Sequence, residues 1–148
     1  MKRVLVCEDE DSIREFVVIN LVRSGYEVVD VNCGEDALKA YDEKDGGFDV
    51  ALLDIMMPGI DGISFTKRLR ADLNYSHIPV ILLSAKTENT AKVEGLLSGA
   101  DVFIEKPFSI SYLRAQIASL LENRKAILEA FNRSPLSSYA SLVTNKGD

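Results

Sequence analysis

The sequence contains few of the residues that define several classes of protein. In 148 residues it has two cysteines, one histidine and no tryptophan. Cys7 and Cys33 form no metal-ligand pattern, so we expect reduced core thiols rather than a disulfide or a metal site. No apolar stretch approaches the roughly 18–20 residues that span a membrane. Lys2 and Arg3 precede an apolar run that stops at Glu8, which is too short for a signal peptide.

The composition predicts a single folded domain. Hydrophobic residues make up 47% of the chain and charged residues 27%, which is enough to build a core and argues against intrinsic disorder. A length of 148 residues suits one domain. The formal net charge of -6 argues against nucleic acid or an anionic membrane as the main partner of this chain.

Short apolar segments alternate with longer amphipathic ones. The pattern predicts strands at 3–7, 26–31, 48–53, 80–83 and 101–105, and helices at 12–24, 34–41, 63–73, 87–98 and 110–131. In two of these helices the spacing directs the following side chains inward: Ile13, Phe16, Val17, Asn20, Leu21, Phe65, Leu69 and Leu73. This alternation predicts an α/β fold, a doubly wound five-stranded parallel sheet of order 2-1-3-4-5, flavodoxin-like, with an extended C-terminal helix.

Five polar residues follow four of the predicted strands. Glu8 and Asp9 end the first strand, Asp54 the third, Ser84 the fourth and Lys106 the fifth. The carboxyl ends of parallel strands share one edge of the sheet, so these side chains should converge there. Singly, the acids could be favoured near a helix N-terminus, Ser84 could be a turn residue and Lys106 a surface lysine. Their joint occurrence at one edge favours a functional site.

The chemistry of this set suits phosphoryl transfer. Three close carboxylates repel one another, and a divalent cation such as Mg²⁺ relieves that repulsion. Asp54 is placed to attack a phosphorus atom and form an acyl phosphate. Mg²⁺, the Lys106 ammonium and the Ser84 hydroxyl would each take one phosphoryl oxygen. No general base is needed, because the carboxylate is already ionised.

The pattern resembles the receiver domains of two-component response regulators. The resemblance covers roughly residues 1–122 and is carried by four segments. These are Glu8-Asp9, the D-x-x-M-P-x-x-D-G stretch from Asp54 to Gly62, Ser84-Ala85, and Ala100 to Phe108.

The resemblance implies a role for each residue of the site. Asp54 would accept a phosphoryl group from the phosphohistidine of a histidine kinase and hold Mg²⁺ with Glu8, Asp9 and the backbone carbonyl of Met56. Lys106 would contact the phosphate. Ser84 and Phe103 would act as the switch that changes the face made by the fourth helix, fifth strand and fifth helix. Glu8 stands where Asp is commoner, so its longer side chain is expected to reach the metal through water, and Phe103 lacks the hydroxyl of the frequent Tyr.

Two other polar residues have simpler interpretations. Asp61 is predicted to be a turn or N-cap residue rather than a second phosphoacceptor. His77, the single histidine, precedes Pro79 in a loop and is predicted to be solvated.

The last predicted helix is longer than the sheet needs. Its apolar stripe is interrupted by Arg124 and comprises Leu113, Ile117, Leu120, Ile127 and Phe131. Two alternatives remain open: the end of the helix folds back on its own domain, or it connects to a following module and pairs between chains. We expect a receiver domain at 1–122 and a helix extension and linker at 123–148, toward an output module that is missing here.

The segment from Leu121 to Pro135 resembles the region after the receiver in hybrid two-component sensors of the Bacteroides type. That resemblance implies a fragment of a hybrid histidine kinase with a transcription-regulating output module. It also implies a cytoplasmic receiver, in a parent protein that can be membrane-anchored, with no membrane contact or direct nucleic acid binding by this chain. A homodimer would form through the fourth helix, fifth strand and fifth helix, or through the C-terminal helix.

Three other functions are weaker. A phosphotransferase or hydrolase with an aspartyl nucleophile on the same sheet type usually needs a second acid two residues after the nucleophile, where Met56 stands. A flavodoxin-like cofactor carrier needs a phosphate-binding loop after the first strand, where this chain has four carboxylates, Glu8 to Asp11. The complete set of site residues argues against a receiver-like module that is never phosphorylated. The fragment is therefore expected to catalyse only its own phosphorylation and dephosphorylation.

Overall fold

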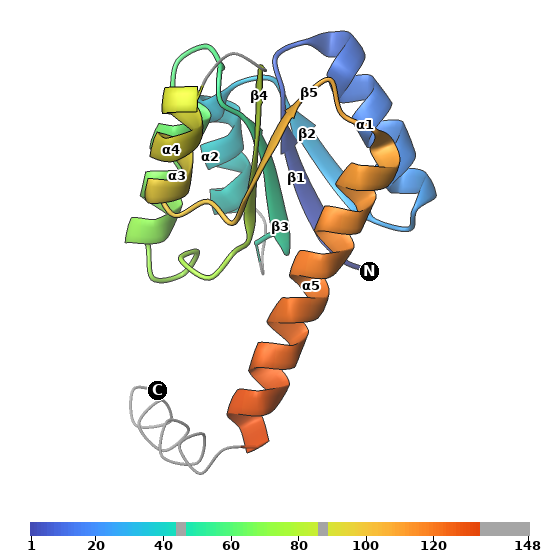
Figure 1. Ribbon diagram of the computed structural model, residues 1–148, viewed down its shortest axis with the longest axis vertical. Helices are drawn as coiled ribbons and strands as arrows, with labels where there is room; N and C mark the ends of the chain where they lie inside the picture. Colours follow the sequence, from blue (N-terminus) through green and yellow to red (C-terminus); the bar gives the residue numbers. More distant parts are fainter. Residues whose placement is uncertain (44–46, 86–88, 134–148) are drawn as a thin grey trace.

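The computed structural model describes residues 1–43, 47–85 and 89–133. Within these ranges five strands alternate with five helices (Figure 1). The strands are β1 (Arg3–Cys7), β2 (Glu27–Val31), β3 (Val50–Asp54), β4 (Val80–Ala85) and β5 (Val102–Lys106). The helices are α1 (Asp11–Arg23), α2 (Gly34–Glu43), α3 (Gly62–Ala71), α4 (Asn89–Leu97) and α5 (Ile110–Arg133).

The five strands form one parallel sheet of order β2-β1-β3-β4-β5, which confirms the predicted fold. Helices α1 and α5 cover one face, and α2, α3 and α4 cover the other (Figure 1). Side chains alternate between these layers along each strand, so Leu5 and Leu53 join one core cluster while Val4 and Leu52 join the other. Because helices cover both faces, every residue of the central strand β3 is buried.

Several predicted positions are corrected by the structure. Leu73 lies beyond the end of α3 and is 91% exposed, so its predicted inward position is wrong. In α1, Val17 and Leu21 are buried as predicted, whereas Phe16 is 49% exposed. Asn20 is only partly buried, and its side-chain amide donates to the Phe16 carbonyl at 2.8 Å. The apolar residues of α1 spread around much of the helix, so their spacing alone did not define one face.

The minor predictions are mostly confirmed. Asp61 is the N-cap of α3, and its carboxylate accepts from the Ser64 N–H at 2.7 Å. His77 is exposed in the loop before β4. Cys7 is a free thiol in the core, and burial raises its pKa to about 12. Cys33 is also free but only partly buried, so the core prediction holds for Cys7 alone.

Helix α5 continues past the sheet as one rod (Figure 1). Leu113 and Ile117 are buried against the sheet, whereas Ile127 is 68% exposed and Phe131 47%. These exposures favour a helix that leaves its domain over one that folds back on it. Arg124, which interrupts the apolar stripe, donates from its guanidinium to the Asp49 carbonyl at 3.4 Å. This hydrogen bond lies where the helix extends beyond the sheet.

The described part of α5 extends to Arg133, two residues past the predicted end. The rest of the predicted extension and linker, residues 134–148, lies outside the described residues. In the part of the chain that the structure describes, none of the helices combines the length and apolar character needed to cross a membrane.

Candidate functional site

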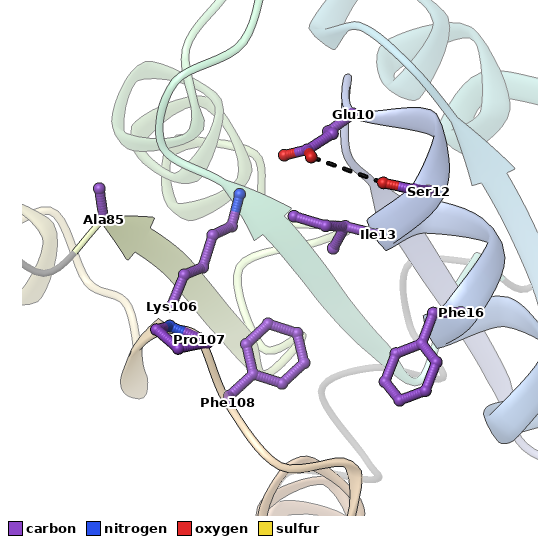
Figure 2. Close-up of a pocket in the computed structure, with 8 residues that line it drawn as sticks. All are labelled: Glu10, Ser12, Ile13, Phe16, Ala85, Lys106, Pro107 and Phe108. Atoms are coloured by element: carbon purple, nitrogen blue, oxygen red, sulfur yellow. Dashed lines mark hydrogen bonds between the residues drawn. The ribbon is translucent and has the colours of Figure 1, made fainter.

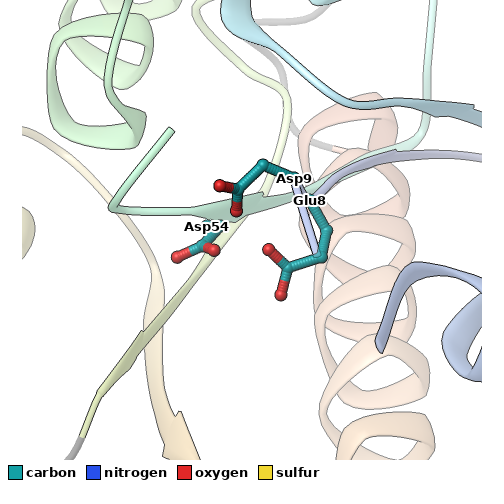
Figure 3. Close-up of side chains that lie close together, drawn as sticks. All are labelled: Glu8, Asp9 and Asp54. Carbon is teal, nitrogen blue, oxygen red and sulfur yellow. The ribbon is translucent and has the colours of Figure 1, made fainter. Parts of the chain in front are cut away.

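Three carboxylates meet at the carboxyl edge of the sheet. Glu8 and Asp9 directly follow β1, and Asp54 is the last residue of β3, its neighbour in the sheet. One oxygen of each carboxylate lies within 4.8 Å of the others (Figure 3). Glu8 is 1% exposed and Asp54 4%, whereas Asp9 is open to solvent. The predicted convergence of the three acids is therefore present in the structure.

Lys106 joins this cluster from the end of β5. Its ammonium donates to Glu8 Oε1 at 2.6 Å and to Asp54 Oδ2 at 2.9 Å, although these residues lie 98 and 52 positions away in the sequence. One cation therefore contacts two buried carboxylates, beside a third acid. If all four groups were ionised, the set would carry two uncompensated negative charges.

The electrostatics of Glu8 and Lys106 follow from this arrangement. Burial, together with the adjacent Asp54 carboxylate, raises the pKa of Glu8 to about 8, and Lys106 opposes this shift. Burial alone would lower the pKa of Lys106, but its hydrogen bonds to Glu8 and Asp54 outweigh that effect and raise it. The second oxygen of Glu8, Oε2, is buried and has no hydrogen-bond partner among the residues that the structure describes.

The donor set fits a hard divalent cation. All three side chains offer carboxylate oxygens, which are the ligands that Mg²⁺ prefers. The unpartnered Oε2 of Glu8 and the excess negative charge both leave an interaction that a cation would supply. The residues present are therefore compatible with the predicted Mg²⁺ site.

Backbone groups also fix the Asp54 carboxylate. The Met56 N–H donates to Asp54 Oδ1 at 3.1 Å, so each carboxylate oxygen of Asp54 has its own donor. A Cβ at Gly62 would lie 2.5 Å from the Asp54 carbonyl oxygen, too close for any other residue. The glycine in the D-x-x-M-P-x-x-D-G stretch thus lets the start of α3 pack directly on the backbone of Asp54.

The two predicted switch residues occupy neighbouring strands. Ser84 is buried in β4, next to Leu83, which pairs with Asp54, and its hydroxyl donates to the Ala85 carbonyl at 3.2 Å. Phe103 is partly buried in β5 and packs on the core cluster beneath α4. Its ring lies close to α4, since a Cβ at Gly95 would be 3.5 Å from it. Both residues are at the predicted edge or face, and their switching roles stay predictions.

An open hollow of about 470 Å³ lies beside Lys106, between α1 and the start of α5 (Figure 2). Its apolar lining comes from Ile13, Phe16, Pro107 and Phe108. This surface was not predicted from the sequence, because the helical spacing of Phe16 predicts an inward position for its side chain. The adjacency of Pro107 and Phe108 to Lys106 was the available signal that apolar side chains border the charged site.

Known proteins resemble this chain both in sequence and in fold. A family model described as the response regulator receiver domain matches residues 4–118. The alkaline phosphatase synthesis transcriptional regulatory protein PhoP of Bacillus subtilis is 42% identical over 121 residues, which cover 81% of this chain and 48% of PhoP. The chain thus spans about half the length of such relatives.

Two further similarities involve histidine kinases. Histidine kinase P4 of Formosa agariphila is 33% identical over 131 residues, covering 88% of this chain and 9% of that protein. The crystal structure of a signal receiver domain from a signal transduction histidine kinase of Syntrophus aciditrophicus superposes with a TM-score of 0.77 at 28% identity, over 83% of this chain and 92% of that one. From the family match and the PhoP identity together, this chain belongs to the response regulator receiver domain family.

Proposed function

We propose that Asp54 accepts a phosphoryl group from the phosphohistidine of a histidine kinase. The observation that carries this proposal is the position of Asp54: a nearly buried carboxylate at a strand end, 2.9 Å from the Lys106 ammonium and beside two other acids. A carboxylate so placed is a nucleophile with a counter-charge already in position. The hollow beside Lys106 offers an apolar surface on which a partner domain could seat its histidine (Figure 2).

In the proposed site, Glu8, Asp9, Asp54 and the backbone carbonyl of Met56 would hold Mg²⁺. When bound, the ion supplies positive charge that offsets the three carboxylates and the incoming phosphoryl oxygens. Because its ligands must be ionised, the raised pKa of Glu8 predicts that binding releases protons.

The chain's own residues carry the transfer. An Asp54 oxygen attacks phosphorus, the bond from phosphorus to the imidazole nitrogen breaks, and the electron pair of that bond leaves with the histidine. Lys106 moves its donor from Asp54 to a phosphoryl oxygen, and the Ser84 hydroxyl contacts another. Ser84 and Phe103 then change the face formed by α4, β5 and α5.

The relatives support a proposal for the larger assembly. We propose a receiver at 1–122 and, at 123–148, a helix extension and linker toward an output module. The PhoP name favours a transcription-regulating output, and the P4 name favours a hybrid kinase parent, for which we retain the Bacteroides type and a cytoplasmic receiver. The exposed Ile127 and Phe131 support a homodimer through α5, with the face formed by α4, β5 and α5 as the alternative.

The competing aspartyl phosphotransferase or hydrolase finds less support. Such an enzyme needs an acid two residues after the nucleophile to protonate a leaving group. Here that residue is Met56, whose side chain is 63% exposed.

Intact mass spectrometry tests the proposal. The chain is incubated with Mg²⁺ and phosphoramidate, and we expect wild type to gain one phosphoryl group. Asp54→Asn should gain none, while Asp61→Asn, which keeps an N-cap side chain within the same motif, should match wild type. An unmodified wild type, or equal labelling of Asp54→Asn, would contradict the role of Asp54.

A further inference from the structure

The loop between β3 and α3, residues 55–61, contacts the proposed phosphoacceptor directly. Its Met56 N–H donates to Asp54 Oδ1 at 3.1 Å. Both ends of the loop are tied to the sheet edge, since the Ile55 N–H donates to the Leu83 carbonyl at 2.9 Å and the Gly62 N–H to the Ile55 carbonyl at 3.1 Å. The orientation of the Met56 peptide therefore depends on how the middle of this loop is held.

Two side chains hold the middle of the loop. Met57 is buried in the core, where its sulfur accepts from the Cys7 thiol at 2.8 Å. On the other side, Glu35 in the first turn of α2 accepts from the Ile60 N–H through Oε1 at 3.3 Å. The Met57 contact belongs to the packing of the core, whereas Glu35 is an exposed residue with a specific backbone partner.

The packing of glycines shows how closely α2 and the loop approach. The Glu35 carboxylate lies directly over Gly59, whose φ is +75°, and a Cβ there would overlap both carboxylate oxygens. A Cβ at Gly34 would lie 2.5 Å from the Ile60 carbonyl oxygen. Two consecutive residues of α2 thus contact two consecutive residues of the loop. The contact of Gly34 with the Ile60 backbone requires glycine, and the positive φ of Gly59 favours glycine there.

A first-turn acid also stabilises a helix through its dipole, and this is the simpler explanation for Glu35. The next residue, Asp36, lies in the same first turn and is also exposed. Within residues 1–43, 47–85 and 89–133, Asp36 makes no hydrogen bond to the loop, while Glu35 does. Asp36 therefore serves as a matched control that shares the dipole effect alone.

We propose that Glu35 is a positioning residue for Asp54: it anchors the loop at Ile60 and Gly59 so that the Met56 peptide keeps its N–H on Asp54 Oδ1. The Met56 carbonyl, which is proposed to hold Mg²⁺, belongs to the next peptide group of the same loop, so the inference rests on the proposed function. Loss of the anchor lets the loop move, which weakens both the hydrogen bond to Asp54 and the cation site.

The first test needs neither metal nor phosphodonor. Proton–nitrogen correlation spectra of the ¹⁵N-labelled chain report the Met56 amide, whose proton resonates downfield while it donates to a carboxylate. We expect Glu35→Ala to shift this proton upfield and to speed its exchange with solvent. Asp36→Ala should leave both unchanged, and Glu35→Gln, which keeps an oxygen acceptor for the Ile60 N–H, should restore wild-type values.

The second test measures the consequence. Calorimetric titration gives the affinity for Mg²⁺, and we expect Glu35→Ala to weaken it on the order of tenfold, as for other residues that orient metal ligands. The rate of labelling by phosphoramidate at saturating Mg²⁺ should fall less than the affinity. Glu35→Gln should recover most of both, and Asp36→Ala should match wild type.

The outcomes separate the two proposals. If wild type takes up no phosphoryl group, the proposed function fails, and the Met56 amide alone then decides whether Glu35 positions Asp54. If wild type is labelled but Glu35→Ala and Asp36→Ala give the same Met56 amide and the same Mg²⁺ affinity, only the role of Glu35 is overturned.

Discussion

Acidic side chains at the two edges of the sheet differ in their ion pairing and in their exposure to solvent. At the amino edge, Glu27 pairs with Arg3 at 3.2 Å and Asp101 pairs with Arg70 at 3.0 Å. Asp49 at the same edge accepts from the Arg3 backbone N–H at 2.7 Å. The side chains of these three acids are 42%, 41% and 32% exposed, respectively. At the carboxyl edge, Glu8 and Asp54 are nearly fully buried and share the Lys106 ammonium, while Asp9 lies exposed beside them.

Acidic residues alone therefore do not mark the functional edge, because both edges have them. The difference is compensation: at the amino edge each acid has a partner and water to screen it, so its pairing contributes little to stability. At the carboxyl edge, buried charge exceeds its compensation, which is costly unless a ligand supplies what is missing. This excess is what indicates a site for a cation.

The largest expected difference between the two edges comes from replacing one lysine at each of them. Lys106→Met leaves two buried carboxylates without their shared cation and should lower the free energy of unfolding by about 3 kcal/mol. Lys2→Met removes a 4.0 Å contact of a 63% exposed side chain with Asp49. It should change stability by less than about 1 kcal/mol. Urea unfolding in a chelating buffer measures both, and equal losses would remove the contrast between the edges.

A slightly smaller effect is expected from the metal itself. Mg²⁺ at a hundred times its dissociation constant should stabilise the fold by about 2.7 kcal/mol, since it binds the folded chain only. Asp9→Ala should remove most of that gain. Asp49→Ala, at the opposite edge, should keep it, whatever the variant does to the baseline. Thermal unfolding with and without Mg²⁺ measures this stabilisation. If Asp9→Ala is stabilised by Mg²⁺ as much as wild type, Asp9 does not bind the metal.

The smallest expected effect is that replacing Glu8 raises the stability of the metal-free chain, whereas replacing a glutamate at the amino edge lowers it. The pKa of Glu8 is raised from 4.5 to about 8 on folding, so below 4.5 both states are protonated and its charge costs nothing. As pH rises toward 8, the unfolded chain ionises while the folded one resists, and metal-free stability falls. Glu8→Gln should flatten this slope and stabilise the metal-free chain at pH 8 by about 1 kcal/mol.

Glu27→Gln is the control at the amino edge. It should destabilise by about 0.5 kcal/mol, because it removes a partly exposed ion pair. Urea midpoints between pH 5 and 8 in a chelating buffer decide the matter. A Glu8→Gln variant that is less stable than wild type at pH 8 would reverse the interpretation of this edge.

The sequence predicted the fold and the composition of the site because both depend on strong local signals. Fully apolar strands such as Val50–Leu53 are typical of a sheet covered on both faces, and their alternation with helices predicts a parallel sheet. That sheet brings Asp54 and Lys106 to the same edge. The face of a single helix was less certain. Phe16 and Leu73 continue an apolar pattern, yet the first lines the hollow beside Lys106 and the second lies beyond the end of α3.

Contacts between side chains far apart in the chain were not predictable. Glu8 was expected to reach a metal through water, but its conformation depends on Lys106, 98 residues away. Arg124 interrupts an apolar stripe in the sequence, and the sequence alone did not predict that its guanidinium donates to the Asp49 carbonyl. Glu35 carried no signal beyond that of an ordinary first-turn acid, because its partner is a backbone N–H 25 residues later.

The rigid departure of α5 has a mechanical consequence. The part from Glu122 to Arg133 is about 18 Å long at 1.5 Å per residue, and it is anchored at its base by Arg124. If this part tilts as one body, a tilt of about 10° at the base would move its tip by about 3 Å. A small rearrangement within the receiver would therefore displace the far end of this helix by about half a helical turn.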